Sequence, residues 1–311
     1  MPLKNNALAP LLNALLEDQP PRAKSLCVTL LGDAIEPHGG SLWLSDLIQL
    51  VAPLGINERL LRTSVFRLVA QNWLQSERHG RRSLYRLSDE GLEQTRRASS
   101  RIYHGTPNDW DGDWTLVVLP RFGNNSLDKR SEVRKQLLWA GFGALAPGIF
   151  ALPRDNAASA NKVLRGLKLT EHALVLGARE MNEGRGLLIQ SLVSQCWDLD
   201  TVAGQYRAFI ARFEPVALAC GTTVRPSLGY LARALALHEW RRIVLHDPQL
   251  PRQMLPDDWP GHRARELCAH VYWAVFDAAE MYLADRLGYD PIHFQPLRPS
   301  VFERFGGRPL P

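Results

Sequence analysis

The pattern of apolar and polar positions over residues 57–72 predicts an amphipathic helix. Four apolar residues share one face of that helix at helical spacing: Leu61, Val65, Leu68 and Val69. Five residues define the opposite face, three in its middle and two at its margins: Arg59, Thr63 and Arg67, then Arg62 and Phe66. Asn57 stands just before the helix and is expected to cap it, because its side-chain oxygen accepts hydrogen bonds from free N–H groups of the first turn. Taken alone, the pattern fits equally a helix that reads DNA and the solvated helix of an ordinary bundle.

Two shorter helical patterns precede this helix. The first covers residues 24–35 and ends at the turn sequence EPHGG. The second follows Ser45, its expected N-cap, and ends at Gly55. Since only a short turn separates the second pattern from the helix over residues 57–72, the pair predicts a helix-turn-helix.

A short basic hairpin is predicted directly after the helix, in the segment ERHGRRSLYRL. Residues 74–78 and 83–87 form its two strands around a His-Gly turn. Cations cluster at its tip and a tyrosine lies on the return strand: Arg78, His79, Arg81, Arg82 and Tyr85. Ser88 then caps a helix over residues 89–103, with acids in its first turn and arginines in its last. This order is typical of a winged helix, whose cationic tip lies along the phosphate backbone or in the minor groove of DNA.

The positive charge of the chain is concentrated in this region. The 311 residues carry a net charge of +5, from 37 Lys and Arg against 32 Asp and Glu. Between Gly55 and His104 there are ten Arg and five acids, so this segment holds the whole surplus and the rest sums to zero. A localised surplus favours a surface that binds a polyanion over general solubility charge.

The remaining chain predicts two further regions in an α+β protein. Residues 1–104 are expected to form the winged helix-turn-helix domain, beginning with a loose arm. Residues 105–190 show the order βαββαβ, which predicts a ferredoxin-like domain. Residues 191–311 are mainly helical, with long apolar periodicity in three segments: 201–213, 227–245 and 262–287.

Several classes of protein are excluded by what the sequence lacks. No apolar run approaches the about 18 residues that span a bilayer, and no signal pattern opens the chain, so we expect a cytoplasmic protein. Four cysteines are scattered without a CxxC pair and are expected to be small buried thiols. Neither a Walker loop nor G-x-S-x-G or H-E-x-x-H occurs, so we expect no catalytic residue, no metal site and no enzyme activity.

The segments LLRTSVFRLVAQNWL and GRRSLYRLSDEG resemble the N-terminal domain of the PaaX-type repressors of phenylacetic acid catabolism. A second segment far downstream, EWRRIVLHDPQLPRQMLPDDWPG at Glu239–Gly261, resembles the C-terminal signature of the same family. Two motifs in the family's order and at compatible spacing make the resemblance specific, and it covers most of the chain. One departure is Asn72, where glycine is commoner in the family.

The resemblance implies a homodimeric repressor that binds double-stranded operator DNA. It implies a middle domain similar to the small nuclease subunit of CRISPR adaptation systems and used for dimerisation. Such a nuclease needs a carboxylate after its first strand, where this chain has Pro120 and Arg121, so nuclease activity is not expected. Control would come from an aryl-acyl-CoA effector such as phenylacetyl-CoA, with no bound cofactor.

Two sets of candidate binding residues follow. The DNA-binding set is Asn57, Arg59, Arg62, Thr63, Phe66, Arg67, Arg78, His79, Arg81, Arg82 and Tyr85. The effector set combines cations for phosphates with polar residues of the long C-terminal helix: Arg121, Arg154, Tyr230, Arg233, His238, Arg241 and Arg242. The alternative function is an acyl-CoA-binding protein or enzyme in which the winged module contacts proteins instead of DNA.

Overall fold

The structure is a computed structural model. It describes residues 3–105, 110–119, 127–154, 156–179, 186–221, 223–288 and 294–308. The chain divides into two compact units. The first comprises Met1–Gly105, Tyr206–Arg242 and Gly261–Pro311, and the second comprises Thr106–Gln205 and Ile243–Pro260. The C-terminal helices, expected as a separate domain over residues 191–311, therefore largely share a unit with the winged helix.

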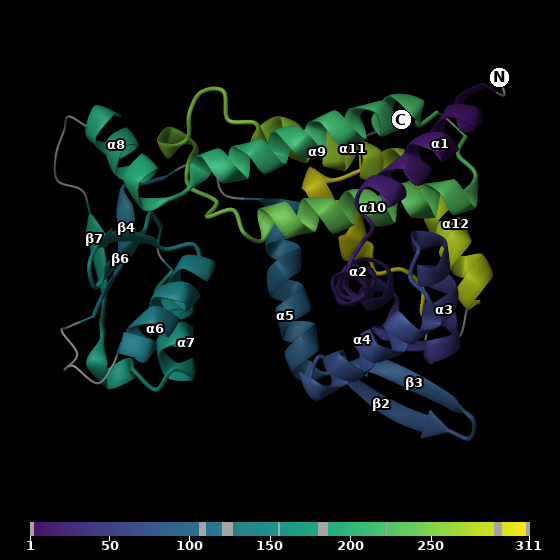
Figure 1. Ribbon diagram of the computed structural model, residues 1–311, viewed down its shortest axis with the longest axis horizontal. Coiled ribbons are helices and arrows are strands. Elements are labelled where there is room, and N and C mark those ends of the chain that lie inside the picture. Colours follow the sequence, from purple (N-terminus) through teal and green to yellow (C-terminus); the bar gives the residue numbers. More distant parts are fainter. Residues whose placement is uncertain are drawn as a thin grey trace. The chain divides into compact units, whose positions relative to one another are not determined.

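The segment predicted to form a winged helix-turn-helix lies at the lower right of Figure 1. Its helices are α2 (Ala23–Leu30), α3 (Leu44–Val51), α4 (Glu58–Ala70) and α5 (Asp89–Ser99), and α1 (Leu3–Asp18) precedes them. Its strands β1 (Ser41–Trp43), β2 (Leu74–His79) and β3 (Arg82–Leu87) form an antiparallel sheet in the order β1-β3-β2. The predicted elements of this region are present, with α1 longer than the short helix expected around residues 11–17.

Three details of the prediction are wrong. The helix over residues 24–35 changes at Leu31 into a π-helical segment, η1 (Leu31–Ile35), and the turn η2 (Glu36–His38) follows. Ser45 does not cap α3, which already begins at Leu44; its hydroxyl donates to the Asp46 carboxylate at 3.0 Å. The last turns of the helix after Ser88 are also π-helical, in η4 (Ser100–His104).

Two residues with a positive φ, Gly55 and Asn72, form the turns that follow α3 and α4. The short 3-10 helix η3 (Ala52–Leu54) after α3 ends at Gly55, whose φ is +80°. After α4, Asn72 has a φ of +56°, a left-handed conformation that glycine adopts freely and Asn better than most residues. The asparagine at this position is therefore compatible with the backbone that the family's glycine serves.

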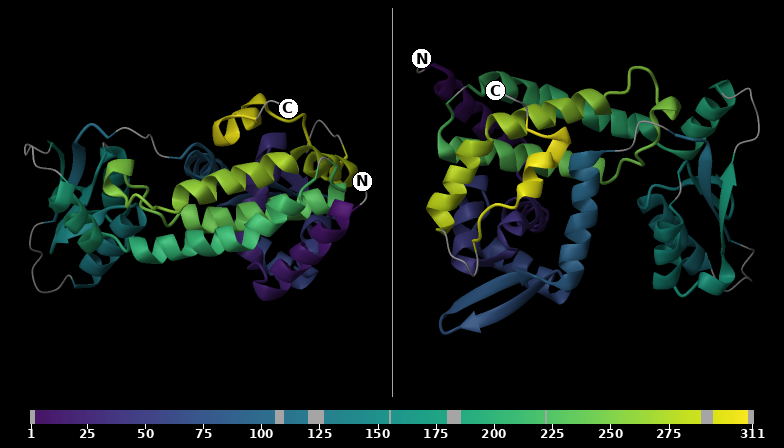
Figure 2. Two further views of the ribbon diagram at one scale, coloured as in Figure 1. Left: turned by 90° about the horizontal axis from the view of Figure 1, so that it is seen from above. Right: turned by 180° about the vertical axis from the view of Figure 1, so that it is seen from behind.

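Long helices complete the first unit. They are α10 (Pro226–Val244), α11 (Gly261–Ala274) and α12 (Phe276–Leu287), joined by most of α9 (Leu199–Ala219) and followed by η7 (Pro299–Gly306). Figure 2 shows α9, α10 and α11 running alongside one another. The apolar periodicity predicted over residues 262–287 is divided between α11 and α12, because the chain leaves helical geometry at Val275, with φ −111° and ψ 5°.

The second unit contains the ferredoxin-like fold that the sequence predicts. Its elements in chain order are β4 (Asp113–Val118), α6 (Leu127–Trp139), β5 (Gly143–Ala146), β6 (Ile149–Leu152), α7 (Ala157–Gly166), η5 (Thr170–His172) and β7 (Leu174–Arg179). The strands form one antiparallel sheet in the order β5-β6-β4-β7. Apolar residues of both helices and the sheet, among them Val133, Phe150 and Leu164, make its core. The helix α8 (Gly186–Cys196) and the turn η6 (Arg252–Met254) also belong to this unit.

None of the helices among the described residues combines the length and apolarity needed to cross a membrane.

Candidate nucleic-acid interface

The outward face of α4 is built by burial of the opposite face. Leu61, Val65 and Leu68 are almost fully buried, and Val69 is half-buried. At the start of the helix, the Asn57 side chain accepts a 2.9 Å hydrogen bond from the Leu60 N–H, as predicted. The five residues assigned to the outward face are all exposed: Arg59, Arg62, Thr63, Phe66 and Arg67. Position on the helix therefore directs two kinds of side chain to opposite sides.

The cations of this face differ in their contacts. Arg62 pairs with Glu58 one turn earlier, with 2.6 Å between Nη2 and Oε1, and both side chains are more than half exposed. Among the described residues, Arg59 and Arg67 have no side-chain hydrogen bond or ion pair. Thr63 donates its hydroxyl to the Arg59 carbonyl at 3.0 Å. Arg59 and Arg67 are thus free to bind an anion or a base edge without first breaking a protein contact.

Phe66 lies in the middle of the face, not at its margin as predicted. It follows Arg59 by seven residues, which is about two helical turns, so the two side chains stack along the same line. Its side chain is 74% exposed. The outward face of α4 therefore presents one exposed aromatic ring, Phe66, with arginines before and after it along the helix.

The tip of the hairpin is cationic and held together by local contacts. Arg78 donates from Nε to the Gly80 carbonyl at 3.1 Å, and His79 Nε2 lies 2.9 Å from Glu77. Among the described residues, Arg81 at the turn has no ion pair or side-chain hydrogen bond. Tyr85 lies half-buried on β3, behind the tip.

Trp43, on β1, was not among the predicted site residues, but it packs against this tip. The guanidinium of Arg82 lies 4.1 Å from the centroid of the Trp43 ring, and the His79 ring contacts the same tryptophan edge-on at 5.5 Å. A cation over an indole face is attracted by its quadrupole. Trp43 precedes the hairpin by about 30 residues, so only the pairing of β1 with β3 brings it there.

Hydrogen bonds around Ser88 connect the end of α4, the hairpin and α5. The Ser88 hydroxyl donates to the Asn72 carbonyl and accepts a 3.0 Å bond from the Gly91 N–H, and the Ser88 N–H donates to the Trp73 carbonyl at 3.1 Å. The cap predicted for α5 is confirmed. The same cap also ties the start of α5 to the segment between α4 and the hairpin.

Five of the residues expected to bind an effector lie on α10, and three of these are buried. The Tyr230 hydroxyl donates to the Leu50 carbonyl at 2.8 Å. Arg233, 2% exposed, pairs with Asp33 and Glu280 at 2.7 and 2.6 Å. His238 is hydrogen-bonded through Nδ1 to the Thr29 hydroxyl at 3.1 Å. Their polar groups face the protein rather than solvent.

Burial and two neighbouring arginines keep the His238 side chain neutral. Burial, and then the nearby charges of Arg242 and Arg241, lower its pKa from 6.5 to about 4. Its Nε2 atom is buried without a hydrogen-bond partner among the described residues.

The other effector candidates are scattered. Arg121 lies outside the described residues. Arg154, in the second unit, donates to the Pro248 carbonyl at 3.0 Å. Arg242 is exposed near the end of α10, and Arg241 is half-buried beside it. The structure does not bring all seven candidates into one site.

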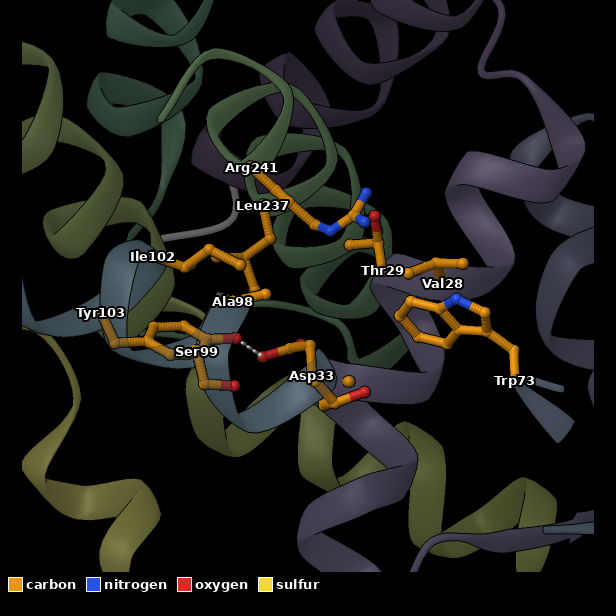
Figure 3. Close-up of a pocket in the computed structure, with 12 residues that line it drawn as sticks. Val28, Thr29, Asp33, Trp73, Ala98, Ser99, Ile102, Tyr103, Leu237 and Arg241 are labelled. Carbon is orange, nitrogen blue, oxygen red and sulfur yellow. Dashed lines mark hydrogen bonds between the residues drawn. The ribbon is translucent and has the colours of Figure 1, made fainter. Parts of the chain in front are cut away.

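Arg241 lines a narrow crevice in the first unit, with about 20 Å³ of space for a water-sized group (Figure 3). The lining comes from α2, η1, α5, η4 and α10, with Trp73 from the turn between α4 and β2. Burial lowers the pKa of Arg241, and the Thr95 hydroxyl is buried without a hydrogen-bond partner among the described residues. Arg241 has no hydrogen bond or ion pair among the described residues. Its charge in a mostly apolar crevice suits a small anionic or strongly polar group.

A buried ion network joins the winged helix to the C-terminal helices. It consists of Asp33, His38, Tyr103, Arg233, Tyr272, Glu280 and Arg304. Burial by itself would raise the pKa of Glu280, but the charge of Arg233 and hydrogen bonds from His38 and Arg233 outweigh it and lower the pKa to about 2. Two arginines balance two carboxylates, so this network is internally neutralised and leaves no charge for a ligand.

No cluster of three or more His, Cys, Asp or Glu that could hold a metal ion occurs among the described residues. All four cysteines are free, and burial raises the pKa of Cys27 to about 12, which leaves it an unreactive thiol.

Three family models match consecutive segments of the chain. They are the PaaX-like protein at residues 22–91, the PaaX protein central Cas2-like domain at residues 107–186 and the PaaX-like protein C-terminal domain at residues 197–285. The transcriptional repressor PaaX of Escherichia coli strain K12 is 36% identical over 292 residues, which is 93% of this chain and 91% of that protein. Among solved structures, the uncharacterized protein Rv0674 from Mycobacterium tuberculosis is similar with a TM-score of 0.54 and 25% identity, over 84% of this chain and 98% of that one.

Proposed function

Because the chain belongs to the family of PaaX-like proteins, which are regulators rather than enzymes, we propose that it is a DNA-binding repressor of an aromatic-acid catabolic operon. One observation carries the DNA contact: the buried back of α4 directs outward Arg59 and Arg67, which have no side-chain partner among the described residues, and the hairpin that follows carries three further arginines at its tip. A helix of this kind enters the major groove, where Arg binds guanine through two hydrogen bonds, and the hairpin follows the phosphates.

The proposed repressor acts as a homodimer on a palindromic operator. Each subunit places α4 in one half-site, and half-sites lie one helical turn of DNA or a multiple of it apart. The family likeness of the middle segment to a Cas2-like domain supports dimerisation through the second unit.

The recognition helix is tested by Arg67→Ala. The Arg67 guanidinium has no partner among the described residues and leaves no buried group behind when removed. We expect operator binding to weaken by about 2 kcal/mol, the contribution of one good contact to a base edge. Titration of labelled operator in a gel-shift assay measures it. Arg263→Ala, an exposed arginine on α11, removes the same charge as a control, and equal losses for both variants would contradict a specific contact.

The hairpin is tested by the double variant Arg81→Ala, Arg82→Ala. Phosphate contacts release counterions, so their loss flattens the dependence of log Kd on log salt by about two units and weakens specific and nonspecific DNA alike. Binding measured at several salt concentrations gives the slope. The pair Arg263→Ala, Arg286→Ala controls for net charge. An unchanged slope in the hairpin variant would remove the hairpin from the interface.

Derepression is proposed to come from an aryl-acyl-CoA such as phenylacetyl-CoA, which dissociates the protein from its operator. Arg241 and Arg242, neighbours at the accessible end of α10, are the described candidates that a CoA phosphate can reach without breaking the buried ion network.

A titration of the protein–operator complex separates this function from its alternative. We expect phenylacetyl-CoA to release the DNA at micromolar concentration, while CoA and phenylacetate added separately do not. Fluorescence anisotropy of the labelled operator follows the release. A protein that binds the CoA ester yet ignores DNA at every salt concentration would instead be the acyl-CoA-binding protein or enzyme of the alternative.

A further inference from the structure

The outward face of α4 contains one large apolar group in a place where cations alone would be enough to hold DNA. Phe66 is 74% exposed, although the other apolar residues of the helix face inward apart from Leu60, which is 51% exposed, and Ala70. A single exposed apolar side chain is common on protein surfaces and by itself indicates nothing. The position of Phe66 is what distinguishes it.

The neighbours of Phe66 are the polar residues of the same face. Arg59 stands two turns earlier, Arg62 and Thr63 stand one turn earlier, and Arg67 is adjacent in sequence. Leu60 lies away from this centre, about 120° around the helix from Phe66, beside Arg67. Whatever surface Arg59 and Arg67 approach, the Phe66 ring is therefore brought against the same surface.

The Phe66 ring has no strong hydrogen-bonding group, and this limits which groups of DNA it can recognise. A phenyl group neither donates nor accepts a strong hydrogen bond, so it gains nothing from guanine, cytosine or phosphate. The edges of the base pairs in the major groove present one apolar group, the C5-methyl of thymine, and Phe is among the residues that contact it.

On the basis of the proposed function, we infer that Phe66 reads the C5-methyl group of a thymine in each operator half-site. The contact is apolar and sequence-specific, whereas the arginines beside it supply base and phosphate hydrogen bonds. Phe66 is a specificity-determining residue of α4 in this arrangement, and a site with cytosine or uracil at that position is bound more weakly.

Uracil substitution tests the contact, because it removes the methyl group and leaves every hydrogen-bonding group of thymine in place. A binding site is first selected from random duplex DNA with the full-length protein, and each thymine is then replaced by uracil in turn. We expect the wild type to lose about fourfold in affinity at one thymine of each half-site, the effect of exposing one methyl group. Phe66→Ala binds the thymine and uracil duplexes equally.

Leu60→Ala is the matched control, since it truncates the other large exposed apolar residue of α4 and keeps the discrimination against uracil. Arg67→Ala weakens binding to the thymine and uracil duplexes alike and so also keeps the discrimination against uracil. Thermal unfolding verifies that Phe66→Ala remains folded, as its exposure predicts. A wild type indifferent to every uracil, or a Phe66→Ala variant that still discriminates, overturns the inference while leaving DNA binding intact. Failure to select any DNA sequence overturns the proposed function as well.

Discussion

Asp33→Asn is expected to lower the free energy of unfolding by about 3–5 kcal/mol, the loss typical of breaking a buried ion pair at one partner. Asp33 is 5% exposed and accepts hydrogen bonds from Arg233 at 2.7 Å, Arg304 at 2.8 Å and the Tyr103 hydroxyl at 2.8 Å. The amide has nearly the same shape but no charge, so two buried guanidinium groups keep only Glu280 as a carboxylate partner. Urea denaturation followed by circular dichroism measures the change.

Glu214→Gln provides the control, because it removes one carboxylate from a surface pair. Glu214 lies 2.8 Å from Arg263, with both side chains about half exposed, and such pairs contribute less than about 1 kcal/mol. If Asp33→Asn were as mild as Glu214→Gln, the buried ion network would not be what joins the winged helix to the C-terminal helices.

The second large effect is expected from Gly91→Ala. A Cβ atom at Gly91 would stand 2.2 Å from the carbonyl oxygen of Trp73, a backbone atom that cannot move aside without moving the end of α4. Overpacking of this kind costs about 1–3 kcal/mol, and a clash with backbone belongs at the upper end of that range. The same shift displaces the hairpin against α4, so operator affinity falls together with stability.

Gly204→Ala is the matched substitution. Gly204 lies within α9 with nothing inside 4 Å of the added Cβ, so the change is expected to stabilise the protein by about 0.5–1 kcal/mol through helix propensity. Thermal and urea unfolding of the two variants measure both effects. A lower free energy of unfolding for Gly91→Ala and a higher one for Gly204→Ala would support the packing argument. Equal losses of stability in the two variants would contradict it.

Sequence periodicity was sufficient for the elements whose information is local. The burial of Leu61, Val65 and Leu68, the cap at Asn57 and the two strands of the hairpin follow from patterns within a few residues. The ferredoxin-like fold of the second unit followed as well, since its element order βαββαβ is recognisable along the chain.

What depends on distant partners was not predictable. Arg233 looked like a ligand-binding cation because its partner Asp33 is 200 residues away in the sequence. The π-helical turns at η1 and η4 leave no signal in apolar spacing, yet they contain Asp33 and Tyr103, which meet in the network. The assignment of Phe66 to the margin of its face was instead an error about local spacing, because the seven residues between Arg59 and Phe66 place both side chains on one line of the helix.

The distance along the chain between Asp33 and Arg304 has a consequence during protein synthesis. Their ion pair spans 271 residues, so at about 5–20 residues per second a ribosome needs on the order of tens of seconds between making one partner and the other. Until the ribosome reaches Arg233, 200 residues after Asp33, Asp33 has neither of its arginines. The nascent chain therefore completes its N-terminal module well before that module has the partners of its buried acid.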